Sequence, residues 1–182
     1  MISFKSEITK ALLNYFFLNP EESLYVNELA RKLGLDKRNL VRKIRELEKE
    51  GLLKSETRGN LKLYSINKRY PLFGEVRNIF LKTAGLEDRL KKILKDIPGI
   101  KKALIYGSYA RNKMSSHSDI DLLVVGSHKM IPLQKQLNIL QKELDREINT
   151  VNMDENEFAK RRRDKDPFIL GILKRKHLEL IQ

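Results

Sequence analysis

Asp119 and Asp121 are the side chains of this sequence whose type and spacing best suit chemistry. They lie two residues apart, just before an apolar run, 122–125, that predicts a buried strand. Because successive side chains of a strand alternate between its two faces, both carboxylates project from the same face. Paired carboxylate oxygens are ligands that suit Mg²⁺. The spacing therefore predicts a divalent-cation site at the start of this strand.

A turn suited to phosphate precedes the two acids. Gly107 and Ser108 follow a second apolar run, 103–106, which also predicts a strand. Residues 109–111 can begin a short helix, and its first backbone N–H groups, beside the Ser108 hydroxyl, suit a phosphate. Two strands that carry a phosphate-binding turn and a carboxylate pair indicate nucleotide chemistry.

The whole segment 103–125 resembles the minimal nucleotidyltransferase family of the DNA polymerase beta superfamily. In that family the Gly-Ser turn holds the nucleotide phosphates and the two aspartates bind Mg²⁺. One departure is Asn112, where the family usually has Gly, and it affects the loop rather than the metal site. The matching positions are Gly107, Ser108, Arg111, Ser118, Asp119 and Asp121.

The resemblance implies transfer of a nucleotidyl group from a metal-bound NTP to an acceptor hydroxyl, with release of pyrophosphate. Gly107, Ser108, Arg111 and Ser118 are then the expected nucleotide-binding residues. Mg²⁺ is the expected metal, with Mn²⁺ as an alternative, and ATP is the favoured NTP. The acceptor stays open between a protein (as a separate chain), an RNA end and a small molecule.

The superfamily also places an acidic residue on the strand beside the two aspartates. Residues 147–153 predict that strand, and Glu147 stands at its start, whereas Asp145 is assigned to the end of the preceding helix. Glu147 is therefore expected to be a third catalytic and metal-binding carboxylate. The alternative is an ordinary surface ion pair of Glu147 with Arg146 or Lys142.

Composition narrows the class of protein. The chain has 182 residues, no Cys and a formal net charge of +13. The absence of Cys excludes disulfides, thiolate zinc sites and thiol nucleophiles, and the charge favours a polyanionic partner. Residues 1–70 carry 15 Lys and Arg against 9 Asp and Glu, and residues 71–182 carry 22 against 15, so both halves are basic. No apolar segment resembles a signal peptide or a membrane span, and a cytoplasmic protein is expected.

The first third of the chain predicts three helices and a hairpin. Apolar spacing indicates helices over 4–18 and 28–33, and Asp36 caps a third that ends near Gly51. Residues 52–55 and 61–66 read as two strands. This order resembles the winged helix-turn-helix of archaeal and bacterial transcription regulators.

One face of the third predicted helix is basic. Arg38, Arg42, Arg45 and Lys49 fall within about 60° of one another around the helix, with apolar residues behind them. A solvated face is the plain interpretation, and a helix that enters the major groove of duplex DNA is the functional one. The residues expected to face DNA are Arg38, Asn39, Arg42, Arg45 and, at the hairpin tip, Arg58.

The predicted fold is therefore α/β (α+β overall), an N-terminal winged helix-turn-helix followed by a mixed-sheet nucleotidyltransferase-like domain. The expected boundaries are 1–70, a connecting helix within 71–85, and 86–182. The connecting helix is either a spacer or a homodimer contact. A basic run, 160–163, is either a solvated face or a contact to triphosphate or nucleic acid.

Two functions of different class fit these patterns. The chain is either an enzyme that a DNA-binding domain brings to its target, or a transcriptional regulator whose transferase-like domain only senses nucleotide. The intact aspartate pair favours the enzyme, because a sensor needs no two-carboxylate metal site.

Overall fold

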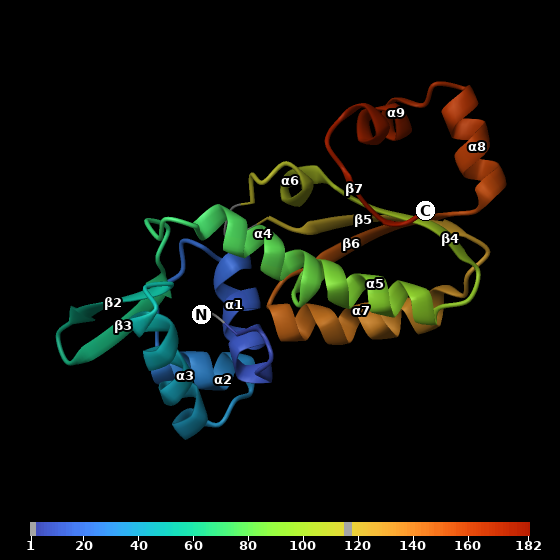
Figure 1. Ribbon diagram of the computed structural model, residues 1–182. Helices are drawn as coiled ribbons and strands as arrows, with labels where there is room; N and C mark the ends of the chain where they lie inside the picture. The colour runs from blue at the N-terminus through green and yellow to red at the C-terminus, as the bar shows by residue number, and fades with distance from the viewer. Residues whose placement is uncertain (1–2, 115–117) are drawn as a thin grey trace. The chain divides into compact units, whose positions relative to one another are not determined.

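A computed structural model describes residues 3–114 and 118–182 of the chain, which divides into two compact units (Figure 1). The first unit consists of residues 1–88 with 143–145, and the second of residues 89–142 with 146–182. Within the part of the chain that the structure describes, no helix has both the length and the apolar character needed to cross a membrane.

The first unit contains helices around a small antiparallel sheet with strand order β1-β3-β2. Its core is formed by apolar residues of the first and third helices, such as Leu12, Phe16, Leu40 and Ile44. Its elements in chain order are α1 (Glu7–Leu18), β1 (Leu24–Tyr25), α2 (Val26–Leu33), α3 (Lys37–Lys49), β2 (Leu53–Arg58), β3 (Leu61–Ile66) and α4 (Phe73–Thr83).

The ends of α3 follow from local chemistry. Asp36 precedes the helix, and its carboxylate accepts a hydrogen bond of 3.0 Å from the backbone N–H of Asn39, as expected of an N-cap. Glu48 near the C-terminal end accepts hydrogen bonds from Ser55 and Lys62 of the hairpin. The Ser55 hydroxyl, more than Lys62, holds the pKa of Glu48 below its usual value, while partial burial opposes this. These contacts tie the hairpin to the end of α3.

The helix expected to connect two domains packs within the first unit. The ring of Phe17 lies 5.8 Å from that of Phe73 and 5.6 Å from that of Phe80, measured between centroids. Arg77 of the same helix donates a hydrogen bond to the backbone oxygen of Phe17. The first compact unit therefore includes α4.

The second unit is a four-stranded mixed sheet with strand order β6-β5-β4-β7. β5 pairs parallel with β6 and antiparallel with β4, and β4 pairs antiparallel with β7, so the predicted mixed α/β architecture is confirmed. The remaining elements are α5 (Leu86–Asp96), β4 (Ile100–Tyr106), α6 (Gly107–Ala110), β5 (Ile120–Gly126), α7 (Met130–Leu144), β6 (Ile148–Met153), α8 (Glu155–Arg163), α9 (Pro167–Lys174) and β7 (Leu178–Ile181).

Helices cover both faces of this sheet. Figure 1 shows α5 and α7 on one face and α8 and α9 on the other. On the α8–α9 face, Ile169 and Ile172 pack with Leu104, Leu123 and Val125 into one buried cluster. Residues 122–126 of β5 are buried throughout, as expected for a central strand that is covered on both sides. The two acids at the start of β5 are therefore held on a rigid element.

Candidate active site

Gly107 begins the turn after β4 and lies against the carboxylate of Asp121. Its φ is +73°, in the left-handed region that favours glycine. A Cβ added to Gly107 would lie only 1.9 Å from Oδ2 of Asp121. The turn can therefore approach the acid this closely only because residue 107 has no side chain.

Asp119 and Asp121 lie at the start of β5, both half-buried. Asp121 pairs with Tyr106 on β4 and with Asn149 on β6. Burial raises the pKa of Asp121 most, the negative charge of Asp119 raises it further, and Arg111 lowers it. Two mutually repelling carboxylates in a partly desolvated position fit a site that a divalent cation neutralises.

The other predicted nucleotide-binding residues lie on the segments that flank these acids. Ser108 belongs to α6, whose turn is closed by a hydrogen bond from the N–H of Lys113 to the Ser108 carbonyl. Ser118 precedes β5, and its carbonyl accepts a hydrogen bond of 2.9 Å from Nη1 of Arg146. Arg146 is buried, so its side chain anchors the chain just before the aspartates.

Asn112, the residue after Arg111, stands where the family pattern has glycine, and its backbone conformation shows why Asn fits there. Its φ is +55°, again in the left-handed region. Glycine adopts this region freely, and Asn tolerates it better than most other side chains. The position thus keeps the backbone conformation that a glycine would allow.

A cavity of about 330 Å³ adjoins the turn. Tyr106 and Phe168 form an aromatic wall, with their rings edge to face and their centroids 5.8 Å apart. Burial, followed by the nearby charge of Asp121, raises the pKa of the Tyr106 phenol. Arg111, Arg175 and Lys176 contribute cations to the lining of the same cavity.

The sequence patterns predicted Arg111 here but missed the part of the cavity built by α9 and the residues that follow it. Phe168, Arg175 and Lys176 line the cavity without being among the predicted site residues. The sequence does show a cationic stretch, 174–176, after an apolar helix. That pattern does not reveal that α9 packs back over the turn.

Glu147, the predicted third carboxylate, is not grouped with Asp119 and Asp121 in the structure. Among residues 3–114 and 118–182, no three His, Cys, Asp or Glu side chains lie close enough together to hold a metal ion. Glu147 is exposed and precedes β6, which begins at Ile148. The parallel register places Asn149, rather than Glu147, beside Asp121, and Nδ2 of Asn149 donates a hydrogen bond of 3.0 Å to Oδ2 of Asp119.

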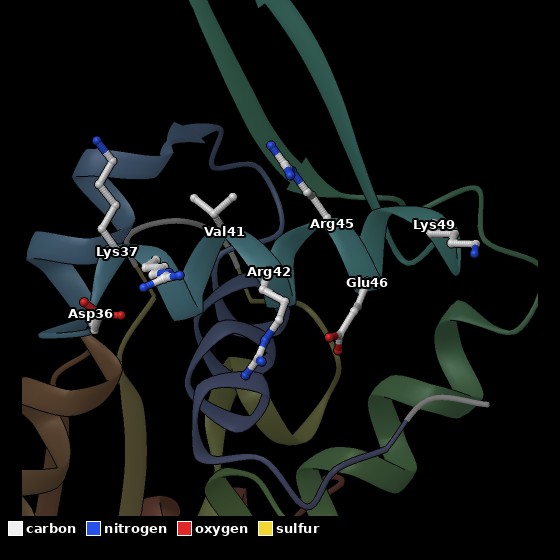
Figure 2. Close-up of a pocket in the computed structure, with 8 residues that line it drawn as sticks. Asp36, Lys37, Val41, Arg42, Arg45, Glu46 and Lys49 are labelled. Atoms are coloured by element: carbon white, nitrogen blue, oxygen red, sulfur yellow. The ribbon is translucent and has the colours of Figure 1, made fainter.

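The residues predicted to face DNA lie on the surface of the first unit. Arg38, Asn39, Arg42 and Arg45 of α3 are all exposed, whereas Leu40, Ile44 and Leu47 are buried. Figure 2 shows Arg42, Arg45 and Lys49 projecting from the helix, and Glu46 beside them. Glu46 also forms an ion pair with Lys43. This surface is therefore mainly, rather than purely, cationic.

Arg58 ends β2 at the tip of the hairpin and is exposed. Its Nε lies 3.1 Å from Oε1 of Glu56 on the same strand. An exposed pair of this kind is weak and exchanges readily with solvent. Arg58 is thus accessible to an anionic partner.

Comparison with known proteins bears on the second unit. Residues 88–176 match the family model described as "Polymerase beta, Nucleotidyltransferase". No curated protein matches the chain.

Solved structures with a similar arrangement include two toxin–antitoxin complexes. One is described as a toxin-antitoxin with AMP-PNP, with a TM-score of 0.38, 22% identity and coverage of 52% of this chain and 71% of the other. Another is the tri-AMPylated Shewanella oneidensis HEPN toxin in complex with MNT antitoxin, with a TM-score of 0.34, 21% identity and coverage of 52% and 67%. At these low values neither likeness indicates what this chain binds or modifies.

Proposed function

We propose, on the premise that residues 88–176 form a nucleotidyltransferase domain of the polymerase beta type, that this chain transfers a nucleotidyl group from a metal-bound NTP to an acceptor hydroxyl. The observation that carries the proposal is the Asp119–Asp121 pair, of which Asp121 lies against the Gly107 turn. A divalent cation bound by the two carboxylates would neutralise charge on the attacking and leaving oxygens during transfer. Mg²⁺ fits this oxygen-rich site, and Mn²⁺ is the alternative.

The chain's own residues bind and orient the NTP in this proposal. The turn from Gly107 through Ser108 brings backbone N–H groups to the phosphates, and Ser118 flanks them. Arg111, Arg175 and Lys176 line one cavity and supply positive charge for a triphosphate. The Tyr106 and Phe168 rings in the same cavity offer an apolar surface for the base. With the phosphates and the base held in this way, the α-phosphate would lie beside the carboxylates.

The proposal is tested by transfer of label from nucleotide to acceptor. The full chain is incubated with ATP, GTP, CTP or UTP, each labelled at the α-phosphate, with Mg²⁺ or Mn²⁺ and a cell extract. We expect label from at least one NTP, with ATP favoured, to enter a product only when the divalent cation is present. Treatment of the product with protease or ribonuclease then separates a protein acceptor from an RNA end. Absence of labelled product with every nucleotide and both metals would contradict the proposal.

A second candidate function is the binding of duplex DNA by a winged helix-turn-helix formed by the first unit. The specific observation is that α3 exposes a row of cations while its opposite side is buried in the core. Such a helix suits the major groove, and the hairpin with Arg58 suits an adjacent phosphate. In this case the aspartate domain either acts as an enzyme beside DNA or senses nucleotide for a transcriptional regulator.

Replacing Arg38, Arg42 and Arg45 together by Ala should weaken duplex binding and its dependence on salt. Each phosphate contact that is lost lowers the slope of log K against log salt by about 0.9. A matched control replaces three exposed cations outside α3, Arg69, Lys82 and Lys101, which changes the net charge equally. Fluorescence anisotropy at several salt concentrations measures both effects. Equal loss in both triple variants would show only general charge attraction and would contradict groove binding by α3.

A further inference from the structure

Asn149 occupies the position on β6 that is level with the aspartate pair. The parallel register of β5 and β6 places Asn149 beside Asp121. Its amide Nδ2 lies 3.0 Å from Oδ2 of Asp119 and donates a hydrogen bond to it. One neutral side chain therefore sits next to both acids, adjacent to one in the sheet and bonded to the other.

An amide at this position has two physical consequences. The hydrogen bond restricts the rotation of the Asp119 carboxylate and leaves Oδ1 and the remaining lone pairs available to a cation. In addition, the group of three side chains carries two negative charges when ionised, because Asn149 adds none. A carboxylate here would be repelled by both neighbours and would also attract a cation more strongly.

We infer that Asn149 is a positioning residue, which orients Asp119 for the metal and limits the negative charge of the site. As a result, the divalent cation binds weakly alone and firmly only together with nucleotide phosphates. The second half of this inference rests on the proposed function, whereas the first half concerns the metal alone. Asn149 thus lies on the strand beside the two aspartates, where the resemblance implies an acidic residue. It makes cation binding depend on the ligand that brings further negative charge.

The test is direct binding of Mn²⁺ to the full chain, measured by electron paramagnetic resonance of the free ion, without nucleotide and with a non-hydrolysable NTP analogue. Asn149→Asp should bind Mn²⁺ alone at least about tenfold more tightly than the parent, since it adds a charge beside two existing ligands. Asn149→Leu, of similar size, should bind Mn²⁺ more weakly because Asp119 loses its hydrogen bond. The parent should gain Mn²⁺ affinity strongly when the analogue is present.

Two variants serve as controls. Asn152→Asp adds the same charge to the same strand, but Asn152 lies three residues further along and contacts His128, with 3.0 Å between Oδ1 and Nε2. Its Mn²⁺ affinity should match that of the parent. Glu147→Gln removes the acid just before β6 and should also leave Mn²⁺ affinity unchanged. Thermal unfolding of all variants separates loss of the site from loss of the fold.

The results distinguish this inference from the proposed function. If both Asn149 variants bind Mn²⁺ like the parent, or if Glu147→Gln is the one that loses affinity, the role of Asn149 is wrong even if nucleotidyl transfer is observed. If Mn²⁺ responds to residue 149 as expected but no NTP yields labelled product, the positioning role stands and the proposed reaction fails.

Discussion

Replacing Asp119 and Asp121 together by Asn should lower the rate of nucleotidyl transfer by at least about a hundredfold. Loss of a single electrostatic contact to a transition state already lowers a rate by about that factor, and this variant loses two charged groups. It should also remove the dependence of NTP binding on a divalent cation. Asn keeps the shape of each side chain but not the charge that holds the metal. Any remaining nucleotide binding would then come from the cations of the cavity alone, Arg111, Arg175 and Lys176.

The same double variant should unfold at an equal or higher temperature than the parent. The folded-state pKa of Asp121 is raised, first by burial and then by Asp119, so ionising this carboxyl at neutral pH costs folding free energy. A carboxyl group whose folded-state pKa is raised lowers the free energy of unfolding at pH values above that pKa. This cost disappears as the pH falls through the raised pKa and the group becomes protonated. Removing the charge therefore removes the cost, which separates a functional loss from a folding defect.

The double variant is measured by transfer of labelled nucleotide, by NTP binding with and without Mg²⁺, and by thermal unfolding. A control with two exposed acids replaced elsewhere, Asp96→Asn and Asp164→Asn, changes the net charge equally. Its transfer activity and metal dependence should match those of the parent. Metal-dependent NTP binding of parental strength in the Asp119 and Asp121 variant would refute the assigned metal site.

Gly107→Ala should disable the site with a single methyl group. The new Cβ would lie 1.9 Å from Oδ2 of Asp121, a separation that atoms do not tolerate, so the turn or the carboxylate has to move. The φ of +73° adds strain of about 1–2 kcal/mol for any residue with a Cβ. We expect transfer to fall by about a hundredfold or more, as typically follows a displacement of 1 Å in a catalytic group, and the unfolding temperature to drop.

Gly74→Ala is the matched control for this variant. Gly74 lies in α4, its backbone φ is not positive, and an added Cβ meets no atom within 4 Å. Because Ala favours helix over Gly by up to about 1 kcal/mol, this variant should be as stable as the parent or more stable, with unchanged transfer. If Gly107→Ala transfers nucleotide at the parental rate, the close contact between the turn and Asp121 is not required for activity.

Local patterns in the sequence were sufficient to predict the geometry of those parts of the site that lie on a single segment of the chain. The alternation of a strand places Asp119 and Asp121 on the same face whatever the strand packs against. Likewise, Asp36 caps α3 through a bond that spans only three residues. The mixed sheet was also predicted correctly, and residues 88–176 match the nucleotidyltransferase family model, since both follow from short apolar runs and a motif within about twenty residues.

The parts of the site that come from separate segments were decided by tertiary structure. Glu147 and Asn149 belong to the same short stretch, and no local signal says which of them stands beside the aspartates. The register between β5 and β6 places Asn149 beside Asp121, and the same register pairs the buried Leu123 with the partly buried Val151.

The cavity follows the same rule, because Phe168, Arg175 and Lys176 reach the turn only through the docking of α9 on the buried cluster. The sequence by itself thus determined the acids and the turn, whose geometry is that of a single strand and its neighbouring loop. The tertiary structure decided their neighbours, because side chains distant along the chain are brought together by packing, which a local pattern does not encode.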